Sequence, residues 1–419
     1  MVNNMNHGPS AADESLAFFA ADSKAVPDLI KDINTLGKFF DSQDDQARIS
    51  LLQKTRALWR ALETPRETMI RHCWAEPAAL CALTAVTEMG LWVRLIELDT
   101  PFKASELAMT NGIDPHLLSR LMRHLAAMGY LMEVGPDTYN TTSFTKAMAL
   151  PRINSFYPCI SGGCLAALNK FHEYGRIHGW NTPSNTSKGP FQYAYNTELN
   201  FFAYLHANPP YAEQFNYHMS GRHLGHPSWL DPGFYPVTEN LVNGFDCSDG
   251  AAMIVDIGGS TGHDLLELHR KYPNIPGRLV LQDLPGVIEQ IVELDSRIEP
   301  TPYNFFTEQP IKGSRAYFMH NILHDWPDDV CLKILANITA AMKPGYSKLL
   351  IYEHVIPATD AHWEATSLDV MMLTILSSKE RTRDNWGELL TKAGLEIRKI
   401  WAVADGLESL IECELAYVS

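Results

Sequence analysis

Residues 254–263 read Ile-Val-Asp-Ile-Gly-Gly-Ser-Thr-Gly-His, and this stretch decides the fold of the surrounding chain. The run Ala251–Val255 has the apolar, β-branched character of a buried parallel strand. The glycines that follow allow the backbone to turn sharply and to approach a ligand closely. Asp264–Tyr272 then has the pattern of a helix, whose first turn presents free N–H groups and a partial positive charge. The stretch therefore predicts a strand–turn–helix unit of an α/β protein that can bind a nucleoside.

An acidic residue, Asp283, ends the next apolar strand, about twenty residues beyond the turn, where a carboxylate can accept hydrogen bonds from ribose hydroxyls. A dinucleotide-binding turn would read Gly-x-Gly-x-x-Gly, whereas this turn reads Gly-Gly-Ser-Thr-Gly. The acidic Asp256 and the nearby His263 suit a ligand with an ammonium or sulfonium group better than a pyrophosphate. The alternative is a plain strand–turn–helix in which the glycines serve only the turn.

Two further predicted strands end in polar residues. Arg315–His320 runs into Asn-Ile-Leu-His-Asp-Trp-Pro-Asp-Asp, which places His324 on a loop, and Lys348–Tyr352 is followed directly by Glu353. Ligands bind at the carboxyl edge of open parallel sheets. Three strand ends therefore carry Asp283, His324 and Glu353. This favours a ligand-binding site over the alternative in which the glycines serve only the turn.

The order of five motifs along the chain resembles the class I S-adenosylmethionine-dependent O-methyltransferases. Within these, it resembles the caffeate-type group and most closely its fungal secondary-metabolite branch, from about Glu67 to the C-terminus. The motifs are Asp-Ile-Gly-Gly-Ser-Thr-Gly-His (256–263), Gln-Asp-Leu-Pro (282–285), Asn-Ile-Leu-His-Asp-Trp-Pro-Asp (321–328), Tyr-Glu-His (352–354) and Lys-Glu-Arg-Thr (379–382).

The resemblance implies an α/β fold, with a Rossmann-like seven-stranded methyltransferase sheet preceded by an all-α/winged-helix dimerisation domain. Its last strands are expected to include Leu395–Ala402 and Ser409–Ala416. The expected organisation is a disordered tail (1–12), a helical and winged-helix dimerisation domain (13–150), a helical acceptor-lining connector (151–234) and an S-adenosylmethionine-binding catalytic domain (235–419).

The resemblance also implies site residues. The cofactor, S-adenosyl-L-methionine, is expected to contact Asp256, Gly258, Gly259, Gly262, Asp283, Leu284, Asn304, Phe305 and His320. The acceptor is expected to contact Phe215, Met219, Met371 and Met372. Two positions depart from the family pattern: Asn304 stands where many members have an acidic residue, and His320 stands where a Lys or Arg often reaches the cofactor carboxylate. An Asn carbonyl can still accept a hydrogen bond from the adenine amino group.

The expected chemistry is methylation of a hydroxyl on an aromatic or polyketide-type metabolite. His324 is the candidate general base, since imidazole titrates near neutral pH, and Glu353 and Glu380 match the family's acidic partners of that imidazole. Each residue also has an interpretation without a catalytic role. His324 would be a surface-loop histidine, Glu353 a solvated strand end, and Glu380 the partner of its neighbour Arg381 in a salt bridge. No metal is expected, because no cluster of His, Cys or Asp has a known ligand spacing.

Two other functions remain open. Some fungal members of this fold bind S-adenosylmethionine without transferring its methyl group and assist dehydration or pericyclic ring formation. A catalytically silent dimeric scaffold or winged-helix regulator is the third possibility, which the polar strand ends disfavour.

The N-terminal third contains a predicted helix–turn–helix followed by a hairpin. Asp114 is a good N-cap and Pro115 a good first residue, Leu117, Leu118, Leu121, Met122 and Leu125 are expected on one apolar face, and Gly129 can end the helix. The pattern is that of a winged helix, which in the resembling family mediates homodimerisation.

Composition limits the partners. The 419 residues exceed one typical domain, and the formal charge of -15 disfavours nucleic acid and anionic membranes. Seven scattered cysteines without a Cys-x-x-Cys, a polar N-terminus and the lack of a long apolar run indicate reduced thiols and a cytoplasmic protein. The resemblance implies a small-molecule hydroxylated acceptor as its partner.

Overall fold

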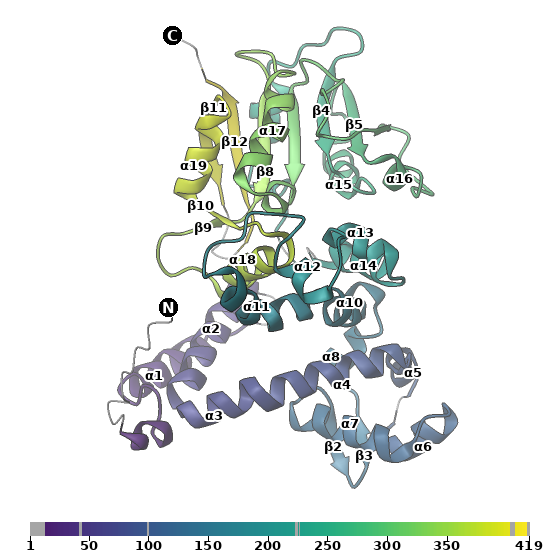
Figure 1. Ribbon diagram of the computed structural model, residues 1–419, viewed down its shortest axis with the longest axis vertical. Coiled ribbons are helices and arrows are strands. Elements are labelled where there is room, and N and C mark those ends of the chain that lie inside the picture. Colours follow the sequence, from purple (N-terminus) through teal and green to yellow (C-terminus); the bar gives the residue numbers. More distant parts are fainter. Residues whose placement is uncertain are drawn as a thin grey trace. The chain divides into compact units, whose positions relative to one another are not determined.

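The computed structural model describes residues 13–41, 44–98, 100–222, 225, 227–402 and 407–416 (Figure 1). Its internal contacts divide the chain into two compact units, Met1–Leu150 and Pro151–Ser419. The tail expected over residues 1–12 lies outside the described residues.

The first unit is mainly helical. Its helices are a 3-10 turn (Glu14–Phe18), α1 (Val26–Gly37), α2 (Asp45–Leu62), α3 (Pro65–Ile70), a π-helical turn (Arg71–Ala75), α4 (Glu76–Glu88), α5 (Leu91–Ile96), α6 (Ala104–Thr110), α7 (Pro115–Ala127) and α8 (Ser143–Ala147). Three short antiparallel strands, β1 (Phe102–Lys103), β2 (Met132–Gly135) and β3 (Thr138–Asn140), pair in the order β1-β3-β2.

Helix α7 begins as its sequence predicts. The Asp114 side chain accepts a hydrogen bond from the Leu117 backbone N–H, and Pro115 is the first helical residue. The buried face consists of Leu118, Met122 and Leu125, which recur at helical spacing. The expectation for Leu117 was wrong, because its position one residue earlier turns it away from this face, and it is 45% exposed.

The second unit is built on a seven-stranded sheet in the order β11-β12-β8-β7-β4-β5-β6. Its strands are β4 (Ala252–Ile257), β5 (Arg278–Asp283), β6 (Ile298–Pro302), β7 (Ala316–His320), β8 (Lys348–Glu353), β11 (Leu395–Trp401) and β12 (Ser409–Leu415). The five strands from β6 to β8 are parallel, and β12 pairs antiparallel with both β8 and β11. The α/β class and the seven strands expected from the sequence are therefore confirmed.

Side chains alternate between the two faces of this sheet, and each face has its own core. On one face, strand residues such as Tyr317 and Ile351 pack with α17 (Asp328–Thr339) and α19 (Arg383–Lys392). On the other, Phe318 and its neighbours pack with α15 (His263–Lys271) and with buried side chains of residues 229–241, which include a π-helical turn (Thr238–Val242). Because both faces are covered, the central strands β4, β7 and β8 are mainly apolar, and their polar side chains collect at their ends.

A helical layer lies beyond the carboxyl ends of the central strands (Figure 1). It consists of α9 (Pro151–Asn154), α10 (Phe156–Gly163), α11 (Leu165–His178), α12 (Pro190–Tyr195), α13 (Phe201–Ala207), α14 (Tyr211–Arg222) and α18 (Trp363–Leu376). Short elements complete the unit: α16 (Pro285–Ile288), a 3-10 turn (Leu323–Asp325), and the parallel pair β9 (Val355–Ile356) and β10 (Arg381–Thr382). Among the described residues, no helix has the length and apolarity needed to cross a bilayer.

Candidate active site

The glycine turn after β4 lies close to the end of β5 and to the side chain of Asp256. Gly258 and Gly262 have φ values of +76° and +84°, which glycine adopts without strain. The N–H groups of Gly258 and Gly259 both donate to the Gln282 carbonyl, at 2.7 and 3.1 Å. A Cβ on Gly259 would lie 2.3 Å from Asp256 Oδ2, so a side chain cannot be accommodated there without a shift. The turn thus ties the ends of β4 and β5 together.

Three carboxylates surround this turn. Asp256 is fully buried, and within the described part of the chain neither of its carboxylate oxygens has a hydrogen-bond partner. Burial, followed by the charges of Asp264 and Asp283, raises the pKa of Asp256 well above its usual value. The carboxylate of Asp283 accepts the N–H groups of Ser260 and Leu284, at 2.8 and 2.7 Å, yet burial still raises its pKa. A cationic ligand would relieve this concentration of negative charge.

The third carboxylate, Asp264, contacts two histidines. Its Oδ2 lies 2.9 Å from Nδ1 of His320 and 3.4 Å from Nε2 of His263. The potential ligand atoms of these three residues lie within 4.8 Å of one another, a spacing that a metal ion could also use. The sequence shows no ligand spacing of a known kind for these three residues, because only the fold brings them together, at the end of β7 and the start of α15.

The remaining expected cofactor residues follow the ends of β5 and β6. Leu284 follows Asp283 and is half exposed. Asn304 is exposed, and its side-chain oxygen accepts the N–H of Phe306 at 3.0 Å, which fixes a local turn. Phe305 packs edge-on against Trp326, with ring centroids 6.1 Å apart.

His324 is buried at the carboxyl edge of the sheet. Its Nδ1 lies 2.6 Å from Oε1 of Glu380, and its Nε2 lies 3.4 Å from Oδ1 of Asp325. Burial alone would lower the pKa of His324, but the negative charges of Glu380 and Asp325 prevail and raise it to about 9. The surface-loop alternative is therefore wrong for His324, and Glu380 is paired with this imidazole.

Glu353 plays a different part from Glu380. It lies at the end of β8, fully buried, and its Oε1 accepts the N–H groups of Ile322 and Leu323, at 3.1 and 2.6 Å. It therefore holds the backbone of the His324 loop. Burial raises the pKa of Glu353 to about 7, against the opposing charge of His324.

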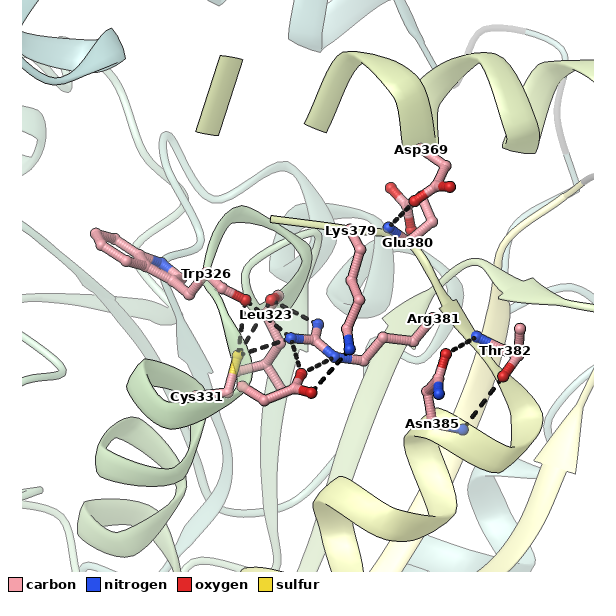
Figure 2. A network of polar contacts seen from close by, with 10 residues as sticks. Leu323, Trp326, Cys331, Asp369, Lys379, Glu380, Arg381, Thr382 and Asn385 are labelled. Atoms are coloured by element: carbon pink, nitrogen blue, oxygen red, sulfur yellow. Dashed lines mark hydrogen bonds and ion pairs between the residues drawn. The ribbon is translucent and has the colours of Figure 1, made fainter. Parts of the chain in front are cut away.

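Two residues of this site were given no functional role in the sequence analysis. Asp369, on α18, accepts the Glu380 backbone N–H at 2.8 Å (Figure 2). Arg381 is buried, with its guanidinium directed at the His324 loop (Figure 2). The Lys-Glu-Arg-Thr motif contained a signal for Arg381, but nothing local distinguishes Asp369 from other acidic helix residues.

The expected acceptor residues lie in the helical layer. Phe215 and Met371 pack against one apolar cluster formed by α10 to α14 and α18, and Met372 is buried on α18. Phe215 also meets Phe201 and Phe202 edge-on, with ring centroids 5.6 and 6.1 Å apart. Met219 is half-buried one turn further along α14. The structure thus brings Phe215 and Met371 to a common cluster, while Met219 is linked to them only through its helix.

This sheet, with a glycine turn, an acidic strand end and a buried histidine at one edge, defines an α/β enzyme that binds a nucleoside cofactor. A model of the O-methyltransferase domain matches residues 187–396. The O-methyltransferase mpaG of Penicillium brevicompactum is 35% identical over 391 residues, covering 93% of this chain and 98% of the relative. The O-methyltransferase asqD of Emericella nidulans is 36% identical over 340 residues, covering 80% and 87%. The chain belongs to the O-methyltransferase family, whose members depend on S-adenosylmethionine.

Two solved structures are similar over nearly the whole chain. LepI in complex with S-adenosylmethionine is 29% identical and superposes with a TM-score of 0.84, covering 93% of this chain and 99% of LepI. OxaC in complex with sinefungin and meleagrin is 26% identical with a TM-score of 0.82 and the same coverage.

The buried pair generates a prediction for the pKa of His324. Glu380→Gln keeps the size of the side chain and removes its charge. The pKa of His324 should then fall from about 9 toward or below its ordinary value, because burial lowers this pKa and the charge of Glu380 no longer opposes that effect. An NMR titration of the ring resonances of His324 measures this change. Asp295→Asn, which alters the 2.7 Å contact to His269 elsewhere, is the control. An unchanged His324 titration in Glu380→Gln would contradict the pairing.

Proposed function

We propose that this protein transfers a methyl group from S-adenosylmethionine to a hydroxyl oxygen of an aromatic or polyketide-type secondary metabolite, with His324 as general base. The observation that carries the proposal is the buried imidazole held by Glu380 at 2.6 Å, on the same sheet edge as the carboxylates of the glycine turn. The fungal relatives named as O-methyltransferases support the reaction class.

The residues around the glycine turn fit the cofactor. The buried carboxylate of Asp256, without a protein partner in the described chain, and the nearby carboxylates form a site for a cationic group. Asp283 would hold the ribose hydroxyls, with Gly258, Gly259 and Gly262 allowing close approach of the backbone. The cofactor supplies a methyl group on a sulfonium, which is electrophilic and has a neutral thioether as its leaving group.

Further contacts would come from residues at or after the ends of β5, β6 and β7. Leu284, Asn304 and Phe305 would face the adenine, and His320, held by Asp264, would face the amino-acid end of the cofactor. His320 would replace the Lys or Arg that many relatives have there, so its protonated form would pair with the cofactor carboxylate.

His324 would remove the proton from the acceptor oxygen. Glu380 accepts from Nδ1–H, which leaves the lone pair of Nε2 for the acceptor hydroxyl. A phenol has a pKa near 10, so a base with a pKa of about 9 is matched to it within about one unit and proton transfer costs little. The carboxylates of Glu380 and Asp325 then stabilise the imidazolium. Orientation of the acceptor and removal of this one proton are the two tasks left to the protein.

The helical layer would orient the acceptor. Phe215, Met219, Met371 and Met372 offer aromatic and thioether surfaces, which suit a flat, largely apolar ring system. In this proposal, residues 151–234 form the acceptor-lining connector and residues 235–419 bind the cofactor. OxaC, which was solved with meleagrin, shows that a similar fold takes a small-molecule ligand.

The first unit would mediate homodimerisation. Several of its large apolar side chains are more than half exposed in the single chain: Phe18, Phe19, Phe39, Trp59, Met69 and Trp74. Surfaces of this kind are typical of protein–protein interfaces.

Dehydration or pericyclic ring formation on a polyketide-derived substrate is a second candidate function. A solved structure described as a pericyclic reaction enzyme is 29% identical to this chain and superposes with a TM-score of 0.84. In that function, His324 would move a proton during dehydration, and no methyl group would reach the product.

A labelled methyl group separates the two functions. The wild-type protein, incubated with isotopically labelled cofactor and a panel of phenolic and hydroxypyridone polyketides, should form a product that carries the label, detected by mass spectrometry. His324→Ala should reduce this turnover by about 10²- to 10⁴-fold while cofactor binding stays unchanged. His269→Ala, which removes an imidazole in the last turn of α15, is the matched control. An unlabelled product that has lost water or isomerised would favour the second candidate.

Asp283 provides a test of cofactor binding that does not depend on the acceptor. Asp283→Ala should raise the dissociation constant of S-adenosylmethionine by about 10- to 100-fold in calorimetry, because charge-assisted hydrogen bonds are lost. Asp295→Ala, which removes a partly exposed carboxylate that contacts His269, should leave the dissociation constant within about twofold. An equal dissociation constant for Asp283→Ala and the wild type would remove the ribose assignment.

A further inference from the structure

Arg381 is a buried cation whose guanidinium donates to the loop that carries His324 and to the first residues of α17. It donates from Nη1 to the Leu323 carbonyl at 2.8 Å and from Nη2 to the Trp326 carbonyl at 2.8 Å (Figure 2). Nε and Nη2 also donate to Oδ1 of Asp328, at 3.0 and 2.8 Å, and Nη2 lies 3.2 Å from Sγ of Cys331. Its side chain is completely buried, whereas Asp328 is 47% exposed.

The two carbonyls bracket the catalytic histidine. Leu323 precedes His324, and Trp326 follows Asp325, so one planar group fixes the backbone on both sides of the imidazole. Arg381 also follows Glu380, the partner of the imidazole, directly in the chain. A single short segment at β10 therefore holds both the ring of His324 and the loop from which it projects.

Glu353 completes this support from the other side. It accepts the N–H groups of Ile322 and Leu323, while Arg381 donates to the carbonyls of Leu323 and Trp326. The loop is thus held at its donors by a buried carboxylate and at its acceptors by a buried guanidinium. The charge of Arg381 also opposes the rise in the pKa of Glu353 that burial causes.

We propose that Arg381 is a positioning residue, which sets the place and direction of the His324 imidazole through the carbonyls of Leu323 and Trp326. This inference rests on the function proposed for His324. A buried guanidinium with one half-exposed carboxylate partner contributes little net stability, because desolvation offsets the attraction. Its planar set of donors does what an ammonium group cannot, since it reaches two carbonyls of the loop and the Asp328 carboxylate at the start of α17 at once.

Arg381→Lys and Arg381→Met separate geometry from charge. In both variants, the kcat for labelled methyl transfer should fall by about 10- to 100-fold, since a shift of about 1 Å at a catalytic group costs this much. The KM for the acceptor and the dissociation constant of S-adenosylmethionine should stay within about twofold. A purely structural role would instead lower the active fraction and leave the kcat per folded molecule unchanged.

The pH profile supplies a second readout. If Arg381 fixes the imidazole beside Glu380, its replacement weakens the 2.6 Å contact whose negative charge raises the pKa of His324. The rising limb of kcat/KM should therefore move to lower pH in Arg381→Lys, which keeps the positive charge and changes the geometry of the donors. A limb that stays in place in Arg381→Lys would contradict the positioning role.

Two control variants are matched to these changes. Arg315→Lys alters a guanidinium that donates to the carbonyls of Asn240, Leu241 and Tyr346 at the opposite end of β7, and should reduce thermal stability only. Lys379→Met removes a 2.8 Å ion pair to the same Asp328 without touching either loop carbonyl, and should leave kcat within about twofold.

The outcomes distinguish the two proposals. If the wild type transfers no labelled methyl group, the proposed function fails, and the same variants are scored on whichever turnover is observed. If His324→Ala loses activity but Arg381→Lys and Arg381→Met keep wild-type kcat and pH profiles, the positioning role alone is overturned. Should Arg381→Met fail to fold, Arg381→Lys and Asp328→Asn carry the test, the latter with a smaller fall in kcat.

Discussion

The contact between His324 and Glu380, 2.6 Å long and buried, is the interaction on which the rest of the site depends. An imidazole in an apolar interior would lose its charge, and only the surrounding carboxylates raise the pKa of His324 to about 9. The pair is useful only if its geometry is fixed. That requirement explains why a carboxylate and a guanidinium, from two other strands, both bind the backbone of the loop.

The site contains two clusters of carboxylates, and their negative charge is compensated in different ways. Near His324, the protein supplies its own cations, the imidazole and Arg381. Around the glycine turn, the buried carboxylate of Asp256 has no partner among the described residues. The proposal assigns that compensation to a cationic cofactor, so cofactor binding and relief of buried charge become the same event. Apo and bound states should then differ in the protonation of Asp256.

Much of this fold follows from local sequence. The strands that end in Asp283, His320 and Glu353 are apolar runs that stop at a polar residue, and the structure has them with only small shifts at their ends. Strand β6 was missed because its five residues include Pro300 and Pro302, which usually argue against a strand. It is possible because β6 is the edge of the sheet and pairs with β5 alone.

The division of labour within the site could not be predicted in this way. Nothing in the sequence indicates that Glu353 binds backbone N–H groups while Glu380 contacts the imidazole, because the choice depends on how β8 and β10 are placed around the loop. Asp369 likewise meets the Glu380 backbone only through the packing of α18. Motifs identified which residues gather, and tertiary geometry decided which atoms they contact.

The central claim is that a carboxylate-held imidazole is the base for methyl transfer. The pH dependence of kcat/KM for transfer of a labelled methyl group tests it most directly. Because the neutral form of His324 is the active one, the rate should rise about tenfold per pH unit below neutrality and level off near pH 9. A rate that is flat across this range, or one whose limb persists unchanged in His324→Ala, would contradict the account.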